Sequence, residues 1–568
     1  MKHNKRWLVF SPLTSQANED LIAYPPILRQ LLFNRGYAAA AEARNYLNAD
    51  LGFNTDPFQM TGMEATVVRI RQAIANSEPI AIYGDYDVDG VTATALLVQT
   101  LRALGGNVSP YIPNRFDEGY GLNPEALDSL KADGIRLVIT VDCGIRSPDE
   151  AAYARTLGLD LIISDHHQPA EGDLPVALAV INPKQTGDRY PDKDLAGVGV
   201  AYKIAEALFK KSDSPAPITL DSLLDLVALG TVADLAPLVG ENRILVKKGL
   251  QRIRETRRQG LFSLAAVAEV TLANANATTI GFVLGPRLNA AGRLESALAA
   301  YDLLTTTDVK HAGDLALQLN NQNRQRQELT RKIQAEAEVI ALADGPDAPL
   351  LFAVHPDFNA GVVGLAAARL VEIYYRPAVV GQISEETTRC SCRSIPEFHI
   401  TEALDQCKDL LVRHGGHAAA AGFTVRNENL EALKERLKSV AREQFAGQEL
   451  RQTVTADIEV SLSDLKPDLL KTLENLQPTG YGNPEAVFVS RNLRITNART
   501  VGSEGKHLKL TVTDGQLTID AIGFRLGHFL PELPPRVDVM YTFEMNEYNG
   551  RKSLQLNLKD IKSTGLPD

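Results

Sequence analysis

Four short apolar runs that alternate with helical stretches constrain the fold of this chain most strongly. The runs are residues 79–83, 137–141, 161–164 and 177–181. Continuous apolar strands separated by helices are typical of a parallel sheet that is covered on both faces. The predicted fold class is therefore α/β. Because ligands bind at the carboxyl ends of the strands in such sheets, the residues after each run are the first candidates for a functional site.

The rest of the chain shows three further patterns. Residues 311–342 form a polar stretch with one apolar stripe, which predicts a long connector helix, and a second α/β unit begins near residue 350. After residue 449, short alternating strands with Asp514-Gly515 and Asn549-Gly550 predict hairpins with two-residue turns, in a small barrel or sandwich. We therefore predict five parts: an N-terminal helical segment at 1–60, a parallel-sheet domain at 61–310, a connector helix at 311–345, a smaller α/β domain at 346–448 and an all-β domain at 449–568.

The composition excludes several classes of protein. The four cysteines form no C-x-x-C pair, so neither a zinc ribbon nor a disulfide framework is supported. The N-terminus is too weakly apolar for a signal peptide and no run is long enough to span a bilayer, so we expect a cytoplasmic protein with no membrane partner. The formal charge of −11 argues against a protein that coats nucleic acid, but it allows a nuclease whose basic groups line one groove.

Three carboxylates follow the first apolar run at alternate positions. Asp85, Asp87 and Asp89 lie in the string G-D-Y-D-V-D-G at residues 84–90. Two such charges about 4 Å apart repel by roughly 4 kcal/mol at an effective dielectric of about 20, so a fold that gathers them needs a cation. The glycine and glutamate of an EF-hand loop are missing, which favours a metal site in an open sheet. A solvated acidic turn is the alternative.

Three more motifs place metal-binding residue types after predicted elements. Asp142 follows the second run, His166 and His167 follow the third, and Asp234 ends an apolar helix. Asp and His ligands without Cys suit Mn²⁺ or Mg²⁺ better than structural zinc. Together with the first carboxylates, these residues predict a centre with two divalent ions, which activates water and suits phosphoryl hydrolysis.

The order of these motifs resembles the DHH phosphoesterase superfamily. The matching strings are D-Y-D-V-D-G at 85–90, V-D-C-G at 141–144, D-H-H at 165–167 and A-L-G-T-V-A-D at 228–234. Further strings narrow the resemblance to the RecJ family of single-strand-specific 5′→3′ DNA exonucleases: P-N-R-F-D-E-G-Y-G-L at 113–122, L-A-G-V-G-V-A at 195–201 and G-P-R-L-N-A-A-G-R at 285–293. The strings G-V-V-G at 361–364 and G-G-H-A-A-A-A-G at 415–422 resemble the associated DHHA1 domain. This resemblance implies that the three globular parts are a DHH domain, a DHHA1 domain and an OB-fold.

The resemblance also implies roles for individual residues. Asp87, Asp89, Asp142, His166 and Asp234 correspond to metal ligands, and all five are expected to be catalytic. Asp85 is expected to support the site or complete a weaker metal position, so we include it among the metal-binding residues. His167 is expected to contact the scissile phosphate as a further catalytic residue. Tyr83 stands where related phosphatases carry a histidine, which affects the ligation of one metal.

A second group of residues is expected to bind DNA or phosphate. Arginine suits bidentate contact with phosphate, and we expect the four arginines of this group in loops or at strand ends. A structural ion pair is the alternative for each arginine, and packing is the alternative for the tyrosine. The group consists of Arg115, Tyr120, Arg287, Asn289, Arg293, Ser391, Arg393, Gly416 and His417.

The function implied by the resemblance is metal-dependent hydrolysis of single-stranded DNA from its 5′ end to 5′-mononucleotides, in DNA repair and recombination. The partners implied are single-stranded DNA, single-strand-binding protein and a recombination helicase, and we expect a monomer. Two alternatives stay open. One is another DHH enzyme, such as a short-oligonucleotide phosphatase, a cyclic-dinucleotide phosphodiesterase or a pyrophosphatase. The other is a non-catalytic DNA-binding scaffold with the same fold, against which the intact carboxylate motifs argue.

Overall fold

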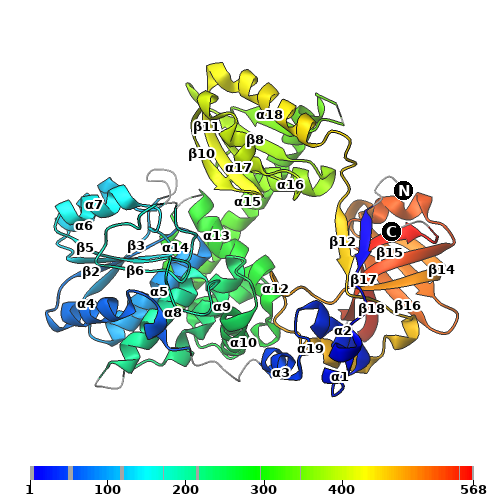
Figure 1. Cartoon of the computed structure of the whole chain (residues 1–568), viewed down its shortest axis with the longest axis horizontal. Helices are drawn as coiled ribbons and strands as arrows, with labels where there is room; N and C mark the ends of the chain where they lie inside the picture. The colour runs from blue at the N-terminus through cyan, green and yellow to red at the C-terminus, as the bar shows by residue number, and fades with distance from the viewer. Residues whose placement is uncertain are drawn as a thin grey trace. The chain divides into compact units, whose positions relative to one another are not determined.

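The computed structural model describes residues 5–48, 55–114, 121–170, 172–212, 216–294, 296–345, 347–548 and 551–565. The chain divides into two compact units (Figure 1). The first consists of Met1–Asn289, Ala297–Ala316 and Thr453–Asp568, and the second consists of Ala290–Ser296 and Leu317–Gln452.

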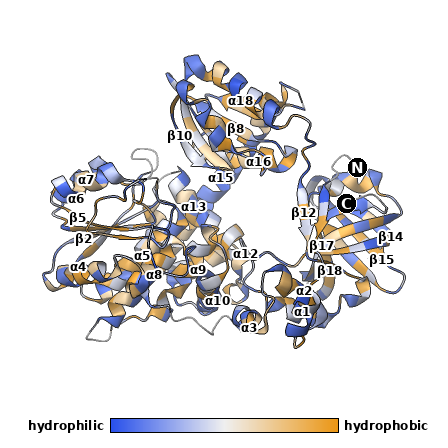
Figure 2. Ribbon diagram, in the orientation of Figure 1, coloured by the Kyte–Doolittle hydropathy of each residue, from blue (hydrophilic) through white to orange (hydrophobic). Residues whose placement is uncertain are grey.

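A five-stranded parallel sheet forms the core of the first unit. Its strand order is β3-β2-β4-β5-β6, and every neighbouring pair is parallel. The strands are β2 (Ile80–Gly84), β3 (Val108–Tyr111), β4 (Leu137–Val141), β5 (Asp160–Ser164) and β6 (Ala179–Ile181). Every residue of β2 and β4 is buried, and the strands carry mainly apolar residues (Figure 2). The predicted α/β fold with a buried parallel sheet is confirmed.

Helices surround this sheet and connect its strands. Three of them bear on the functional site: α5 (Val88–Ala103), α8 (Gly197–Lys210) and α9 (Leu224–Ala233), which pack against one another. α5 begins directly after β2, so the first acidic motif lies in the turn between a strand and a helix. The other helices of this part are α4 (Met63–Ala75), α6 (Pro124–Ala132), α7 (Pro148–Thr156), α10 (Gly240–Arg254), α11 (Gln259–Val267), α12 (Ala277–Thr279), α13 (Gly285–Leu294) and α14 (Leu298–Thr305).

The second unit contains a mixed sheet of order β10-β11-β9-β8-β7, in which only β7 and β8 are parallel. The strands are β7 (Leu351–His355), β8 (Ala378–Ile383), β9 (Thr387–Arg393), β10 (Leu411–His417) and β11 (Ala420–Arg426). The helices are α16 (Val363–Tyr374), α17 (Ile400–Asp405) and α18 (Leu430–Gln444). The predicted long helix is confirmed as α15 (Val309–Leu342), and its Ile333, Ala337 and Ala341 are buried in the core of this unit.

The C-terminal strands form a closed barrel in the first unit. The strands β14 (Phe488–Val501), β15 (His507–Thr513), β16 (Thr518–Gly523), β18 (Arg551–Ser563) and β17 (Arg536–Tyr548) are neighbours in this order, and β17 pairs with β14 to close the ring. The predicted barrel is thereby confirmed. Thr513 pairs with Thr518, so the Asp514-Gly515 hairpin has a four-residue connection and not the two-residue turn that we expected. Asn549-Gly550 lies outside the described residues.

The N-terminal segment contains a strand as well as the predicted helices. β1 (Arg6–Val9) pairs with β12 (Thr453–Ala456), and α1 (Ser15–Asp20), α2 (Pro26–Asn34) and α3 (Ala40–Asn48) follow it. Leu21, Leu31 and Leu32 are fully buried in the same apolar cluster as Phe488 and Tyr541 of the barrel. Residues from the two ends of the chain therefore share one core.

Candidate metal centre

The first acidic motif forms a compact turn at the carboxyl end of β2. Asp87 caps α5, because its Oδ1 accepts hydrogen bonds from the amides of Asp89 at 2.9 Å and Gly90 at 3.1 Å. A Cβ on Gly90 would lie 2.5 Å from the backbone nitrogen and oxygen of Asp85, so only glycine fits there. This close approach brings Asp85 beside the start of α5, where Asp87 is the N-cap and Asp89 lies in the first turn.

Asp89 is held by the N-terminus of α8. Its Oδ2 accepts from the amide of Gly197 at 2.7 Å and its Oδ1 from the amide of Val198 at 2.8 Å. Backbone amides at a helix N-terminus stabilise a negative charge, which offsets part of the cost of burying this carboxylate. A Cβ on Gly230 in α9 would lie 2.8 Å from Asp89 Oδ1, so α9 also packs closely against it.

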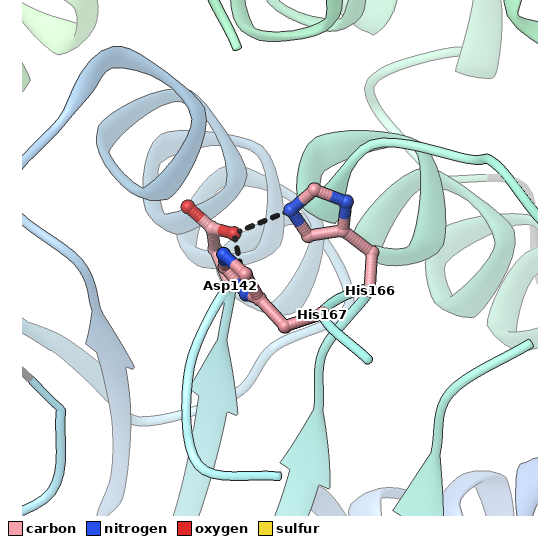
Figure 3. Close-up of side chains that lie close together, drawn as sticks. All are labelled: Asp142, His166 and His167. Atoms are coloured by element: carbon pink, nitrogen blue, oxygen red, sulfur yellow. Dashed lines mark ion pairs between the residues drawn. The ribbon is translucent and has the colours of Figure 1, made fainter. Parts of the chain in front are cut away.

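The ends of β4 and β5 bring Asp142 and His166 together. His166 Nε2 lies 3.0 Å from Asp142 Oδ1, and 3.8 Å from both Asp89 Oδ2 and Asp234 Oδ2. Figure 3 shows Asp142 facing the imidazole rings of His166 and His167. Asp142 has a positive φ of 62°, a strained backbone conformation that is typical of functional sites. Four elements distant in sequence therefore converge on one imidazole.

Asp165 positions His167, a role that our candidate residues did not include. Its Oδ1 lies 2.8 Å from His167 Nδ1 and accepts from the amides of His166 at 2.7 Å and His167 at 3.0 Å, while its Oδ2 accepts from Ile145 N at 3.0 Å. Asp165 therefore fixes the orientation of the His167 ring. The D-H-H string was the available signal, since a carboxylate often orients a neighbouring functional histidine.

The site residues form three overlapping groups. Within each group, the ligand atoms lie within 4.8 Å of one another. The groups are Asp142, His166 and His167; Asp89, His166 and Asp234; and Asp85, Asp87 and Asp142. Asp142 Oδ1 and His166 Nε2 are buried, and neither has a hydrogen-bond partner among the described residues. Buried oxygen and nitrogen atoms that face one another in this way fit a divalent cation of the Mn²⁺ or Mg²⁺ type.

Burial and mutual repulsion shift the protonation of these groups. Burial and then the charge of Asp87 raise the pKa of Asp89 to about 7. Burial and then the charges of Asp89 and Asp87 raise the pKa of Asp234 to about 9. Burial, followed by the charges of neighbouring carboxylates, raises the pKa of Asp142 well above its usual range. Burial lowers the pKa of His166 to about 3, so its ring is neutral and can donate a lone pair to a metal.

The pKa of His167 shifts in the opposite direction. Burial alone would lower it, but the hydrogen bond to Asp165 and the charges of Asp165, Asp89 and Asp87 raise it. The pKa of Asp165 is lowered, because its contacts with His167 outweigh the opposing effect of burial. The pKa values of the two adjacent histidines are therefore shifted in opposite directions, and this difference suits a metal ligand beside a group that binds an anion.

The expected DNA-binding residues lie on several elements. Arg115 and Tyr120 lie outside the described residues. Arg287 and Arg293 lie on α13, so the expectation of loops or strand ends is wrong for both. The glycines and proline of this motif resemble a loop, but Pro286 follows a π-helical stretch (Ile280–Leu284), where the regular helix hydrogen bonds are already interrupted. Asn289 Oδ1 accepts from the amide of Val88 at 3.1 Å, which ties α13 to the first acidic motif.

The other predicted phosphate-binding residues gather in the second unit. Arg393 is at the end of β9, as expected, and donates to Ser391 Oγ at 3.1 Å. β11 lies between β9 and β10, which ends with Gly416 and His417. A Cβ on Gly364, in the first turn of α16, would lie 2.8 Å from Ser391 Oγ. Ser391 and Arg393 therefore face a helix N-terminus, which is an arrangement suited to a phosphate.

Fold and site together define a phosphoesterase of the DHH class with a C-terminal OB-fold. The DHH family N-terminal domain matches residues 79–231, the DHHA1 domain matches 347–443 and the RecJ OB domain matches 456–560. The chain is 40% identical to the single-stranded-DNA-specific exonuclease RecJ of Bacillus subtilis over 98% of this chain and 70% of that protein. The chain belongs to the RecJ family.

Two solved structures agree with this assignment. The crystal structure of Thermus thermophilus RecJ in complex with Mn²⁺ has a TM-score of 0.85 and 30% identity, over 99% of this chain and 80% of that chain. The structure of the same protein in complex with Mg²⁺ has a TM-score of 0.80 and 29% identity, over 99% and 79%. Within the described part of this chain, we find no helix with the length and apolar character needed to cross a membrane.

Proposed function

We propose that this chain is a metal-dependent exonuclease that degrades single-stranded DNA from the 5′ end to 5′-mononucleotides, in DNA repair and recombination. One observation carries the proposal: His166 Nε2 faces carboxylates from β4, α5 and the end of α9, in a chain of the RecJ family. Acidic and imidazole ligands without a thiolate are the set expected for metal-assisted phosphodiester hydrolysis.

Asp85, Asp87, Asp89, Asp142, His166 and Asp234 would hold two divalent ions. When bound, Mn²⁺ or Mg²⁺ would activate water and neutralise charge at the reacting phosphate. The amides of Gly197 and Val198 keep Asp89 fixed before the substrate arrives. The contact with Asp165 raises the pKa of His167, which favours the protonated ring that would donate a hydrogen bond to a phosphate oxygen.

The phosphate-binding residues of the second unit would determine that degradation starts at the 5′ end of the strand. Ser391, Arg393, Gly416 and His417 would bind the 5′-terminal phosphate. Arg115, Arg287 and Arg293 would bind phosphates of the strand. A guanidinium and a helix N-terminus both favour a phosphate with two negative charges over an internal phosphodiester with one. The barrel would hold the strand on the 3′ side of the reacting bond, as OB-folds do.

The remaining features of the proposal concern the cellular setting. We expect the enzyme to act as a monomer in the cytoplasm, with single-strand-binding protein and a recombination helicase as partners. We also propose that the chain is organised in five parts: 1–60, 61–310, 311–345, 346–448 and 449–568.

Digestion of end-labelled single strands tests the proposal. A 5′-phosphorylated strand with a 3′ label should shorten from its 5′ end and release mononucleotides when Mn²⁺ is present. Asp142→Ala should abolish this hydrolysis and retain strand binding, whereas Asp173→Asn, an exposed carboxylate on the same domain, should behave as wild type. Full activity of Asp142→Ala would exclude the proposed metal centre. Cleavage of dinucleotides but not of long strands would indicate a different DHH enzyme.

A further inference from the structure

Helix α17 holds the strand β10, which ends with two of the predicted phosphate-binding residues. The hydroxyl of Thr401, in the first turn of α17, donates to the carbonyl of His417 at 3.0 Å. At the last residue of the same helix, Asp405 Oδ1 lies 2.7 Å from His414 Nε2 of β10. The helix and the strand pack against each other in the second unit (Figure 1). α17 is therefore fastened to β10 at both of its ends.

The strand β10 has few other anchors. It lies at the edge of the sheet, and among the described strands it pairs only with β11. Most of its residues are exposed, and Gly415 and Gly416 have no side chain that could pack. A Cβ on Gly416 would lie 2.4 Å from the carbonyl oxygen of Ala420, so a larger residue does not fit at this position. The end of β10 therefore depends on hydrogen bonds from outside the sheet.

The segment that leads from β9 into α17 provides a fixed support. Three of its apolar side chains are buried in the core of the second unit: Ile395, Phe398 and Ile400. Directly after Arg393, the amide of Ser394 donates to the carbonyl of Ala419 at 2.8 Å, in the turn that follows β10. The amide of Ile400 donates to the carbonyl of Ala418 at 3.1 Å. This segment therefore fixes the position of the turn relative to Arg393.

The spacing of the predicted phosphate site depends on this connection. Ser391 and Arg393 lie on β9, whereas Gly416 and His417 end β10, and β11 lies between the two strands. Neighbouring strands are about 4.8 Å apart, so the two halves of the site lie on strands that are about 10 Å apart. Groups that bind one small ligand need to be held within about 0.5 Å of their working positions. An edge strand that is not fastened would not keep this geometry.

We propose that Thr401 and Asp405 are positioning residues of the terminal-phosphate site, because they hold Gly416 and His417 at the distance from Arg393 that one phosphate requires. This inference rests on the proposed exonuclease function. It assigns part of the preference for a 5′-phosphorylated end to a helix that does not itself contact the phosphate. Without these contacts, β10 would sample more positions and the terminal phosphate would bind more weakly. The metal centre lies in the first unit and would keep its activity.

The test compares two single strands of one sequence, one with a 5′-phosphate and one with a 5′-hydroxyl, in steady-state digestion by the full-length protein with Mn²⁺. Thr401→Val removes the hydroxyl at nearly constant shape. It should raise KM for the phosphorylated strand about tenfold, while kcat for both strands and KM for the hydroxyl strand stay unchanged. Asp405→Ala should have the same effect. Thr401→Ser and Asp405→Asn keep a hydrogen-bonding group and should restore the wild-type preference.

Thr330→Val is the matched control for the loss of a hydroxyl. The Thr330 hydroxyl also donates to a backbone carbonyl, that of Arg326 at 2.7 Å, but this contact lies within α15 and does not involve β10. The control should keep the wild-type preference for the phosphorylated strand. Equal weakening of both strands in Thr401→Val would indicate a general loss of structure and would overturn the inference. Unchanged KM values in both Thr401→Val and Asp405→Ala would also overturn it.

A double variant tests whether Thr401 acts through His417. His417→Ala alone should raise KM for the phosphorylated strand about tenfold, and adding Thr401→Val should cause little further change, because the side chain that Thr401 positions is gone. Losses that multiply to about a hundredfold in the double variant would contradict the positioning role. The proposed function is judged separately, because wild type must release mononucleotides from the 5′ end of the phosphorylated strand whether or not α17 positions the phosphate.

Discussion

Asp165 illustrates how much a catalytic side chain depends on the residue that holds it. The carboxylate accepts hydrogen bonds from three backbone amides and contacts His167 Nδ1. All four neighbours present N–H groups to it, so only a group with two acceptor oxygens satisfies them. This contact and the neighbouring carboxylates raise the pKa of His167, whereas burial lowers the pKa of His166 to about 3.

We expect Asp165→Asn to lower kcat by about 10- to 100-fold, the usual effect of losing a partner that orients a functional group. The amide nitrogen would face a backbone N–H, and the pKa of His167 would fall because the negative charge is gone. The loss of activity on the alkaline side should then begin at a lower pH than in wild type. Steady-state kinetics on a short single strand across the pH range measures both effects. Asp173→Asn is the control, and an unchanged profile in Asp165→Asn would contradict the role.

Most site residues could be predicted because topology alone brings them together. Asp142 and His166 follow neighbouring parallel strands, whose carboxyl ends lie at one edge of the sheet. The supporting groups could not be predicted in the same way. The amides of Gly197 and Val198 reach Asp89 only through the position of α8, and a backbone amide has no sequence signature. The contact of Asn289 with Val88 could not be predicted for a similar reason, since it depends on where α13 packs.

At the scale of elements, α8 links two of the carboxylates. Its first amides donate to Asp89, and its first residue approaches Asp142 so closely that a Cβ on Gly197 would lie 2.8 Å from Asp142 Cβ. A methyl group at this position must displace either the helix or the strained end of β4. Gly199, two residues further along, has no such conflict: the nearest atom to an added Cβ is 3.4 Å away, on Leu195.

We therefore expect Gly197→Ala to reduce hydrolysis by at least about 100-fold, which corresponds to about 2.7 kcal/mol of transition-state stabilisation. Gly199→Ala should retain activity and melt at the same or a higher temperature, because alanine favours a helix by about 1 kcal/mol over glycine. Kinetics and thermal melts of the two variants provide the comparison. Equal activity in both would show that the approach of α8 to Asp142 does not matter for catalysis.

Most strands of the parallel sheet could be predicted from the sequence, whereas β3 and α13 could not. Apolar runs identify β2, β4 and β5 because buried parallel strands need no polar face. β3 was not identified, since it has only four residues, includes a proline and lies at the sheet edge. The arginine-bearing motif of α13 resembled a loop because glycine and proline are weak local evidence when packing decides the conformation.

At the scale of the whole molecule, the two ends of the chain stabilise each other. Trp7 of β1 donates from Nε1 to Asp560 Oδ2 of β18 at 2.7 Å, and both residues are buried. Such a contact between residues 553 positions apart leaves no local pattern in the sequence. For this reason, the sequence pattern predicted residues 1–60 as a separate helical segment.

This contact predicts that the free energy of unfolding depends on pH. Burial raises the pKa of Asp560, although the hydrogen bond from Trp7 opposes the shift. A carboxyl group with a raised folded pKa stabilises the fold fully below its unfolded pKa, about 3.9, and this contribution is lost as the pH rises through the folded pKa. Asp560→Asn, which keeps an acceptor for Trp7, should therefore remove part of the decline in the free energy of unfolding above about pH 4.

Urea denaturation followed by Trp7 fluorescence measures this effect, because Trp7 is the single tryptophan of the chain. The exposed Asp20→Asn in α1 provides a control of the same charge change in the N-terminal segment. Parallel stability curves for wild type and Asp560→Asn across the pH range would show that the pKa of Asp560 is the same in the folded and unfolded states, which would contradict the prediction.

The metal centre makes the stability of the first unit depend on divalent ions. Without metal, the buried Asp89 and Asp142 lie near the partly buried Asp234, and their raised pKa values report the cost of charging them. An ion that binds only the folded state at 100 times its dissociation constant adds about 2.7 kcal/mol to the free energy of unfolding. The second unit contains none of these ligands. The stability of the second unit should therefore change little when divalent ions bind.

Hydrogen exchange with Mn²⁺ or with a chelator distinguishes the two units in the full-length protein. We expect Mn²⁺ to slow exchange in β2, β4, α5 and the first turn of α8, and to leave β8 and β9 unchanged. Asp142→Asn should lose most of this protection, because both the carboxylate charge and one ligand oxygen are gone, whereas Asp173→Asn should keep it. Equal slowing in both units would mean that Mn²⁺ acts through binding elsewhere, and protection retained in Asp142→Asn would exclude Asp142 as a ligand.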